Sequence, residues 1–138
     1  MKRYLIDANT LISFVTDRHP EQQVRAARLF EQAAQGKALL LCPHNVLVEF
    51  AYVMDKVFQQ PKSLVRQILA DLVAMPGVEV PPEAEFTEIL AFWPEPFPDL
   101  GDALVAAVAR REKKASVATF DRAFAQGLRQ LKLAVWEE

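Results

Sequence analysis

The amino-acid sequence predicts an α/β protein in which a central parallel sheet of four or five strands lies between two layers of helices, a three-layer α/β/α fold. Short apolar runs alternate along the chain with longer segments in which apolar residues recur every three or four positions. This alternation is typical of a parallel sheet covered on both faces. The run at residues 38–42 is apolar throughout, as expected for a central strand. The chain has 138 residues, 51% of them hydrophobic, which predicts a single domain over residues 1–138.

Proline and glycine residues divide the first half of the chain into six elements. Pro20 and Pro43 are expected to open helices, whereas Gly36 and Pro61 end them. The expected elements are, in order, a strand at 4–6, one or two helical turns at 11–15, a helix at 21–35, a strand at 38–42, a helix at 43–58 and a helix at 62–74. The buried face of the first long helix is expected to hold Val24, Ala27, Phe30 and Ala34.

The second half continues the alternation around one proline-rich loop. Residues 93–98 contain three prolines and are predicted to lack regular structure. Asp99 follows this loop and is expected to cap the next helix. The expected elements are, in order, a strand at 78–80, helices at 83–92 and 100–113, a strand at 116–119, a helix at 122–131 and a final strand at 133–136.

Composition excludes several classes of protein. The formal net charge of −2 leaves no global basic field, which argues against a tight non-specific duplex binder but not against an enzyme with a local basic patch. Cys42 is the single cysteine, so no internal disulfide forms, and this suits a reducing cytosol. The sequence shows neither a signal-peptide core nor an apolar run of transmembrane length. We therefore expect a cytoplasmic protein that does not associate with a membrane.

Two acids are expected at the same edge of the sheet. Asp7 ends the first strand and is the only charged residue between Tyr4 and Thr16. Asp121 follows the strand at 116–119. The carboxyl ends of parallel strands meet at one edge, where ligands bind in open α/β sheets. An isolated carboxylate at the end of an apolar strand is unfavourable unless something pairs with it.

Two further acids lie on helices. Glu49 is the only formal charge between Pro43 and Met54, on a helix that is apolar nearly all round and therefore expected to be buried. Such a glutamate is either paired or holds a cation. Asp102 lies in the first turn of the helix at 100–113, and the topology predicts that it reaches the same edge. Asp99 is expected to be a helix cap that contacts a metal, if at all, through water.

The acids have an alternative structural interpretation. Acids in the first turn of a helix complement its dipole, which explains Asp102 and Asp121 taken singly. Asp7 and Glu49 have no evident partner, and the sequence offers no buried Lys or Arg to match all four acids. A hard cation with oxygen ligands, Mg²⁺ or Mn²⁺, is the simplest explanation. Zinc is disfavoured because the cysteine and the two histidines lack ligand spacing.

Four short motifs together resemble a known family. The chain resembles the PIN domain over essentially its whole length, and its size and motifs are similar to those of the VapC-type toxins of toxin–antitoxin pairs. The motifs are Leu5-Ile6-Asp7-Ala8-Asn9, Val48-Glu49-Phe50, Asp102-Ala103-Leu104-Val105-Ala106-Ala107 and Ala118-Thr119-Phe120-Asp121. Each motif is weak alone, whereas four in this order and spacing are fairly specific.

The resemblance implies a metal-dependent endoribonuclease. Its acidic cluster, which would be both catalytic and metal-binding, consists of Asp7, Glu49, Asp102 and Asp121. Asn9 and Thr119 match the polar companions of the first and last acids. The resemblance also implies an RNA substrate, frequent homodimers and inhibition by a cognate antitoxin protein. One or two Mg²⁺ ions would bind the scissile phosphate and lower the pKa of the attacking water.

Basic and aromatic side chains near these acids are candidate RNA contacts. The arginines expected to reach phosphates are Arg18, Arg25, Arg28 and Arg122, although each is equally explained as part of a solvated helix face. The basic cluster at residues 110–114 lies at the far end of the helix of Asp102, so we do not expect it to bind substrate. Trp93 and Phe97 are candidates for base stacking, with packing as the alternative.

Three other functions compete with this prediction. Asp7-Ala8-Asn9-Thr10 superficially resembles the strand-end signature of haloacid dehalogenase phosphatases, but Asn9 stands where that family has an aspartate. A non-catalytic binding module with the same fold would not need four carboxylates. A nuclease for structured DNA would usually carry more acids and a larger basic clamp.

Overall fold

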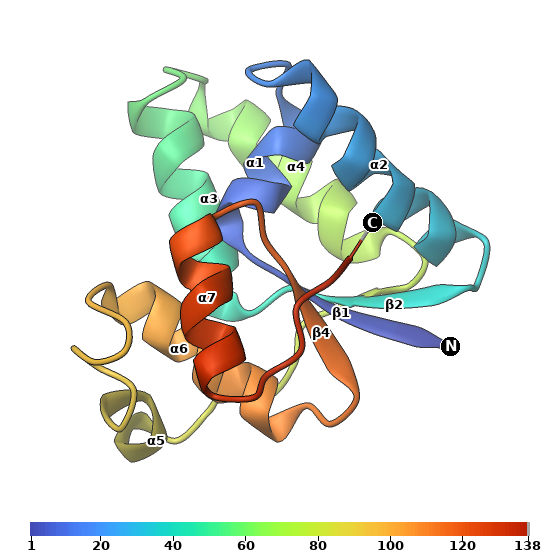
Figure 1. The fold of residues 1–138 in the computed structure, drawn as a ribbon. Helices are drawn as coiled ribbons and strands as arrows, with labels where there is room; N and C mark the ends of the chain where they lie inside the picture. Colours follow the sequence, from blue (N-terminus) through green and yellow to red (C-terminus); the bar gives the residue numbers. More distant parts are fainter. Residues whose placement is uncertain (138) are drawn as a thin grey trace.

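Four parallel strands form the central sheet in the structure, a computed structural model that describes residues 1–137. The strands lie in the order β3 (Val78–Glu79), β2 (Ala38–Leu41), β1 (Lys2–Ile6) and β4 (Ala115–Ala118). Figure 1 shows β2, β1 and β4 side by side. Leu5 of β1 pairs with Leu41 on one side and Val117 on the other, and all three are buried. The predicted parallel sheet is therefore confirmed, with four strands in the described part of the chain. Glu138, the last residue of the predicted domain, lies outside the described residues.

Helices cover both faces of this sheet. Figure 1 shows α1 to α4 on one side and α5 and α6 on the other, and Phe124 of α7 packs edge-on against Phe97 in the loop between α5 and α6. Right-handed crossovers that run first toward β3 and then back to β4 place the connecting helices on opposite faces. The helices are α1 (Ala8–Val15), α2 (Pro20–Ala34), α3 (His44–Lys56), α4 (Lys62–Ala74), α5 (Phe86–Leu90), α6 (Leu100–Arg111) and α7 (Arg122–Gln130).

Two predicted elements differ in the structure. The strand expected at 133–136 is wrong: this segment forms one isolated parallel bridge, between Val117 and Val135, and so adds no fifth strand. The helix expected at 83–92 begins only at Phe86, because Pro81 and Pro82 keep the preceding segment extended. The loop at 93–98 contains turns without a helix or strand, as predicted.

The first two helices also depart from prediction. Helix α1 starts at Ala8 instead of residue 11, since Asp7 caps it directly. Helix α2 is rotated relative to the expected face, and Val24 is 54% exposed. The larger side chains determine the buried face, because the Phe30 ring stacks on that of Phe14 at a centroid distance of 3.8 Å. The buried residues of α2 are Ala26, Leu29, Phe30 and Ala33.

None of the helices described in residues 1–137 combines the length and the apolar character needed to cross a lipid bilayer.

Candidate active site

Asp7 is held where β1 ends and α1 begins. Its Oδ1 accepts the backbone N–H of Thr10 at 2.9 Å, and its carboxylate is also hydrogen-bonded by the Thr119 side chain. The residue is only 7% exposed. Burial raises the pKa of Asp7, and the negative charge of Asp121 raises it further, although the hydrogen bonds from the two threonines oppose this change. The carboxylate is thus oriented by its neighbours while its charge remains uncompensated.

Thr119 connects Asp7 with Asp121. The Asp121 backbone N–H donates to the Thr119 hydroxyl at 3.1 Å. That hydroxyl therefore accepts on one side and directs its own proton to Asp7 on the other. Asp121 caps α7 by accepting the Phe124 N–H at 3.0 Å. The two acids thus meet at the carboxyl ends of β1 and β4, as the strand rule predicts.

Glu49 approaches these acids from α3. The prediction that this helix is buried all round is wrong, since Val48 is 69% exposed and Tyr52 is 62% exposed. Only one face of α3 packs into the core, and Glu49 lies on the exposed part of the helix. The pKa of Glu49 is raised by partial burial, then by the negative charges of Asp99 and Asp7. Those charges place Glu49 within electrostatic reach of the strand-end acids.

Asp102 is the acid on which all the others act. Its pKa is raised from 3.8 to about 7, first by burial and then by four negative charges, those of Asp99, Asp121, Asp7 and Glu49. Asp99 caps α6, as predicted, by accepting the Asp102 backbone N–H at 3.0 Å. No lysine or arginine contributes to the pKa changes of Asp7, Glu49 or Asp102. We call Asp7, Glu49, Asp99, Asp102 and Asp121 the acidic cluster.

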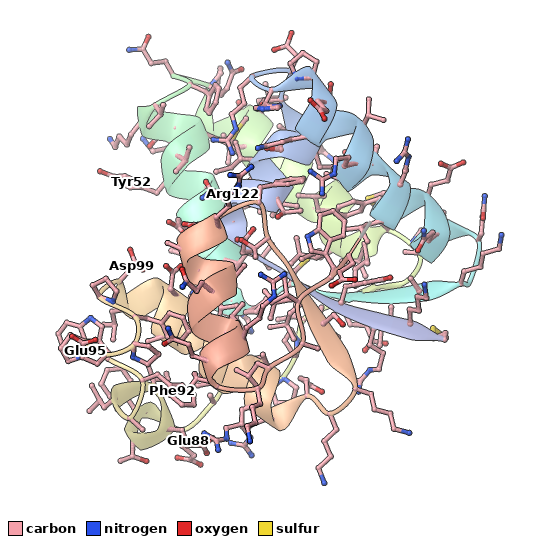
Figure 2. The ribbon with its side chains drawn as sticks, in the orientation of Figure 1. Tyr52, Glu88, Phe92, Glu95, Asp99 and Arg122 are labelled. Atoms are coloured by element: carbon pink, nitrogen blue, oxygen red, sulfur yellow. The ribbon has the colours of Figure 1, made fainter. Side chains whose placement is uncertain are left out.

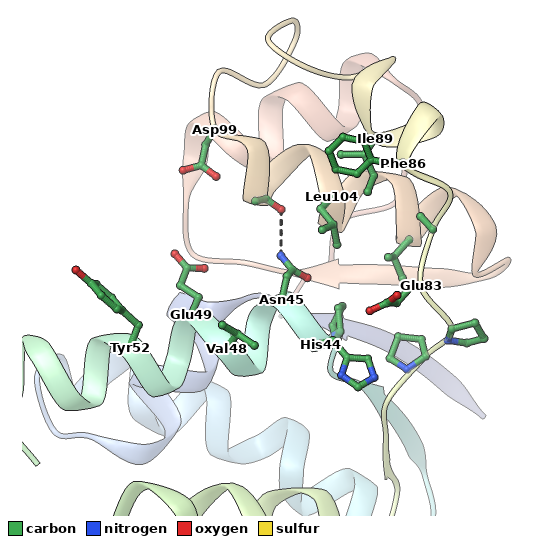
Figure 3. Close-up of a pocket in the computed structure, with 16 residues that line it drawn as sticks. His44, Asn45, Val48, Glu49, Tyr52, Glu83, Phe86, Ile89, Asp99 and Leu104 are labelled. Atoms are coloured by element: carbon green, nitrogen blue, oxygen red, sulfur yellow. Dashed lines mark hydrogen bonds between the residues drawn. The ribbon is translucent and has the colours of Figure 1, made fainter. Parts of the chain in front are cut away.

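Asn45 joins the two helices that carry Glu49 and Asp102, and the sequence analysis did not identify it. Its Nδ2 donates to the Gly101 carbonyl at 3.4 Å, which ties α3 to the first turn of α6 (Figure 3). Its Oδ1 is buried without a hydrogen-bond partner among the described residues. The spacing of Asn45 one helical turn before Glu49 is the signal that would have found it.

The chemistry of the acidic cluster fits a divalent cation, but the side chains are not gathered as metal ligands. Several carboxylates raise one another's pKa values, and hard oxygen donors suit Mg²⁺ or Mn²⁺. Within residues 1–137, however, no three His, Cys, Asp or Glu side chains converge closely enough, as placed, to hold one ion. Rotation of carboxylate side chains toward the ion would be needed to complete a coordination shell.

Comparison with known proteins identifies the family. Residues 4–127 match the model of the PIN domain. The chain belongs to the PIN domain family. PIN domains are a family of nucleases that generally use divalent metals. A comparison with curated proteins gives no match. The matched range includes the whole acidic cluster and ends within α7.

The polar companions of the PIN acids differ in their contacts. Thr119 is buried between Asp7 and Asp121, whereas Asn9 is exposed. The Asn9 backbone carbonyl accepts a hydrogen bond from Arg18 Nη2 at 3.1 Å, and the same nitrogen donates to Ser13 at 3.2 Å. Asn9 and Arg18 line a small hollow together with Asp121.

The candidate RNA-binding arginines separate into two groups. Arg25 and Arg122 line a pocket beside Asp121, and Arg25 lies over the rings of Phe120 and Trp136 at 5.1 and 5.5 Å. Arg18 lines the neighbouring hollow. Arg28 instead lines a separate hollow with Met1 and Lys2, at the amino end of β1. The structure therefore does not group Arg28 with the acidic cluster.

Other basic and aromatic candidates have structural roles. Phe97 is buried and packs edge-on against Phe124, so it is not available for base stacking. Trp93 is partly exposed, and its indole N–H donates to the Pro98 carbonyl at 2.9 Å. Arg110 lies over the Phe92 ring and Arg111 pairs with Glu88 at 3.5 Å, which agrees with a surface role for this cluster.

An apolar groove of about 840 Å³ borders the acidic cluster on its other side (Figure 3). It runs between α3 and the α5–α6 region. The acidic residues that line the groove are Glu49, Glu83 and Asp99. Its apolar lining includes Val48, Tyr52, Pro81, Pro82, Phe86, Ile89, Leu104 and Val108.

Proposed function

We propose that this PIN domain is a metal-dependent endoribonuclease and the toxin of a toxin–antitoxin pair. One observation carries the catalytic part of the proposal. Burial and then the charges of Asp99, Asp121, Asp7 and Glu49 raise the pKa of Asp102 to about 7, and no basic side chain in the described part of the chain lowers it. Such an arrangement is costly to a folded protein, and clusters of this kind are typical of functional sites. The family match favours this function over a haloacid dehalogenase phosphatase.

The proposed catalytic and metal-binding residues are Asp7, Glu49, Asp102 and Asp121, with Asp99 in reach through water. When bound, Mg²⁺ or Mn²⁺ supplies a water of lowered pKa and offsets negative charge on the phosphate. The chain's own contribution is orientation. Thr10 and Thr119 fix the Asp7 carboxylate before any ion arrives, and Thr119 keeps Asp121 beside it. Preorganised ligands of this kind reduce the cost of forming the reactive arrangement.

Cleavage of RNA by the purified protein tests this proposal. Total RNA and tRNA are incubated with the wild type and with Asp7→Asn, in Mg²⁺, Mn²⁺ or EDTA. We expect metal-dependent fragments from the wild type alone. Asp71→Asn is a matched control, because Asp71 lies exposed on α4 and its carboxylate accepts a hydrogen bond from Gln67 of the same helix. Full activity of a folded Asp7→Asn protein would contradict the assignment, and metal-independent cleavage by the wild type would contradict the mechanism.

We further propose that the apolar groove receives the antitoxin. The charged acids that line it are Glu49, Glu83 and Asp99, so a matching segment would combine apolar side chains with a Lys or Arg. Such a cation would reach the acidic cluster and oppose metal binding. Co-expression with the product of an adjacent small gene, followed by purification, tests this. Val48→Lys should weaken the complex, since it places a charge on the exposed apolar lining.

The homodimer implied by the resemblance is also a proposal. Light scattering during gel filtration should give twice the mass of one chain. Val57, which directly follows α3, is 66% exposed and does not line the groove, so it supports an interface at this end of the helix. A monomeric mass at all concentrations up to about 100 μM would contradict it, because specific dimers usually form well below that range.

A further inference from the structure

We propose that the polar pocket beside Asp121 binds backbone phosphates of the RNA strand that flanks the cleaved bond, with Arg122 and Arg129 as its principal contacts. This rests on the proposed function, since it names where that substrate is held. The pocket has a volume of about 760 Å³ and is bordered by the start of α2, residues 119–122, the outer face of α7 and Trp136. The sequence analysis did not include Arg129, which lies two residues beyond the range that matches the family.

The spacing on α7 places both arginines along the same wall. Arg122 and Arg129 are seven residues apart, so they lie on one face of the helix, with Gln126 between them. Their backbones are separated by roughly 10 Å along the helix axis at 1.5 Å per residue. Figure 2 shows Arg122 at the N-terminal end of α7, the end that Asp121 caps. The row therefore begins at the acidic cluster and leads away from it.

The two arginine side chains in this row are available to bind phosphates. Arg122 and Arg129 are both exposed, and their side chains form no ion pair or hydrogen bond within residues 1–137. Arg25 also lines the pocket, where it lies over the rings of Phe120 and Trp136. The acids that share the pocket are Glu21 and Asp121, and Asp121 belongs to the acidic cluster. The α7 wall of the pocket therefore presents two arginines that are unpaired within residues 1–137, although the whole chain carries a net charge of −2.

A second hollow extends this surface past the acidic cluster. It has a volume of about 450 Å³ and is lined by Asn9 and Arg18. Its other lining residues, His19, Gln22, Phe120 and Asp121, also line the larger pocket. The His19 Nδ1 accepts the Gln22 backbone N–H at 3.2 Å, so the neutral ring carries its proton on Nε2, the remaining donor. The two hollows are therefore adjacent, and their polar linings together extend from Arg18 past Asp121 to Arg129.

The opposite side of the cluster does not suit a polyanion. There the apolar groove presents Glu49, Glu83 and Asp99 as its charged acids, which would repel phosphates. A strand bound at the acidic cluster therefore gains favourable charge contacts only toward α7. RNA and a protein partner would thus approach the cluster from different sides.

The test is binding of a 12-nucleotide single-stranded RNA in EDTA, which separates binding from cleavage. Fluorescence anisotropy is measured at several salt concentrations for the wild type, for Arg122→Gln/Arg129→Gln, and for Arg66→Gln. Arg66 is an exposed arginine on α4, which lines neither hollow. Each lost phosphate contact lowers the salt slope by about 0.7 on a single strand, so the double variant should lose about 1.4. At 0.1 M salt this corresponds to roughly 25-fold weaker binding.

The outcomes separate this inference from the proposed function. Weaker binding and a smaller slope in the double variant alone would support the pocket, even if the wild type cleaved no RNA tested. Unchanged binding and slope in a double variant with an unaltered melting temperature would overturn the pocket, even if the wild type were an active nuclease. Equal losses in Arg66→Gln would also overturn it, because they would indicate a diffuse charge effect. Where cleavage is measurable, the double variant should raise KM more than it lowers kcat.

Discussion

Replacing Asp102 with asparagine should stabilise the metal-free protein while it abolishes cleavage. Burial and four negative charges raise the pKa of Asp102 to about 7. Asparagine has nearly the same shape and no charge, so it removes the repulsion without opening a cavity. Below a pH of about 4 the carboxyl is neutral in both the folded and unfolded states, and the substitution should then change little.

The magnitude follows from the difference between the two pKa values. Between 3.8, the value in the unfolded chain, and about 7 in the folded protein, the folded state holds a proton that the unfolded state has released. Wild-type stability therefore falls as pH rises through this window and levels off above it. At 1.36 kcal/mol for each pH unit, the free energy of unfolding would fall by about 4 kcal/mol across this window for a group fully shielded from solvent. Asp102 is only partly buried, and solvent screening reduces this to about 1–2 kcal/mol.

Thermal denaturation in EDTA at pH 4 and pH 8 measures the effect. At pH 8 the Asp102→Asn protein should melt about 3–6 °C above the wild type, and the gap should shrink toward pH 4. Added Mg²⁺ should raise the melting temperature of the wild type more than that of the variant, because it offsets the same repulsion. Asp71→Asn, on exposed α4, is the control and should show neither effect. A destabilised variant, or a gap independent of pH, would refute the electrostatic reasoning.

Three further substitutions test the surroundings of the acidic cluster. Thr119→Val removes the hydroxyl that links Asp7 and Asp121. The loss of about 1–2 kcal/mol of hydrogen bonding should lower the cleavage rate about 5- to 30-fold, and Thr119→Ser should restore it. Equal rates in all three proteins would contradict this. Trp136→Phe removes the indole N–H that donates to the Thr119 carbonyl at 3.0 Å, and urea denaturation should show a loss of about 1 kcal/mol, whereas unchanged stability would show that this bond contributes nothing. Gly127→Ala places a Cβ 2.5 Å from Cε1 of the buried Phe97 ring, so the same measurement should show a loss of about 1–3 kcal/mol, and a stabilised protein would indicate that the ring moves freely.

The fold was largely predictable because its signals are local. Apolar runs such as 38–42, bounded by Gly36 and Pro43, identify strands without reference to the rest of the chain. The predictions failed where contacts between distant parts of the chain determine the local structure. The segment at 133–136 has strand-like residues, but it meets β4 at one bridge only. The face that α2 buries depends on the position of the Phe14 ring, which the periodicity of α2 does not contain.

The candidate site divides in the same way. Asp7 and Asp121 were expected together because strand ends of a parallel sheet share an edge, and the structure places them there. Glu49 drew attention as a lone charge in a supposedly buried helix, yet α3 is exposed on that side. The expected burial of α3 was wrong because the sequence of one helix does not show which of its apolar faces meets a partner.

The sequence by itself determined the four strands of the sheet, the cap at Asp99 and the family of this chain, because these depend on residues that are neighbours along the chain. Only the tertiary structure decided which charges meet. It brought Asp7, Glu49 and Asp121 from separate elements to act on Asp102, and it put Arg28 at the opposite end of β1 from Asp7. It also placed Arg129 in the pocket beside Asp121. Electrostatic interactions depend on distance through space, and in a folded chain that distance is set by packing between elements rather than by separation in sequence.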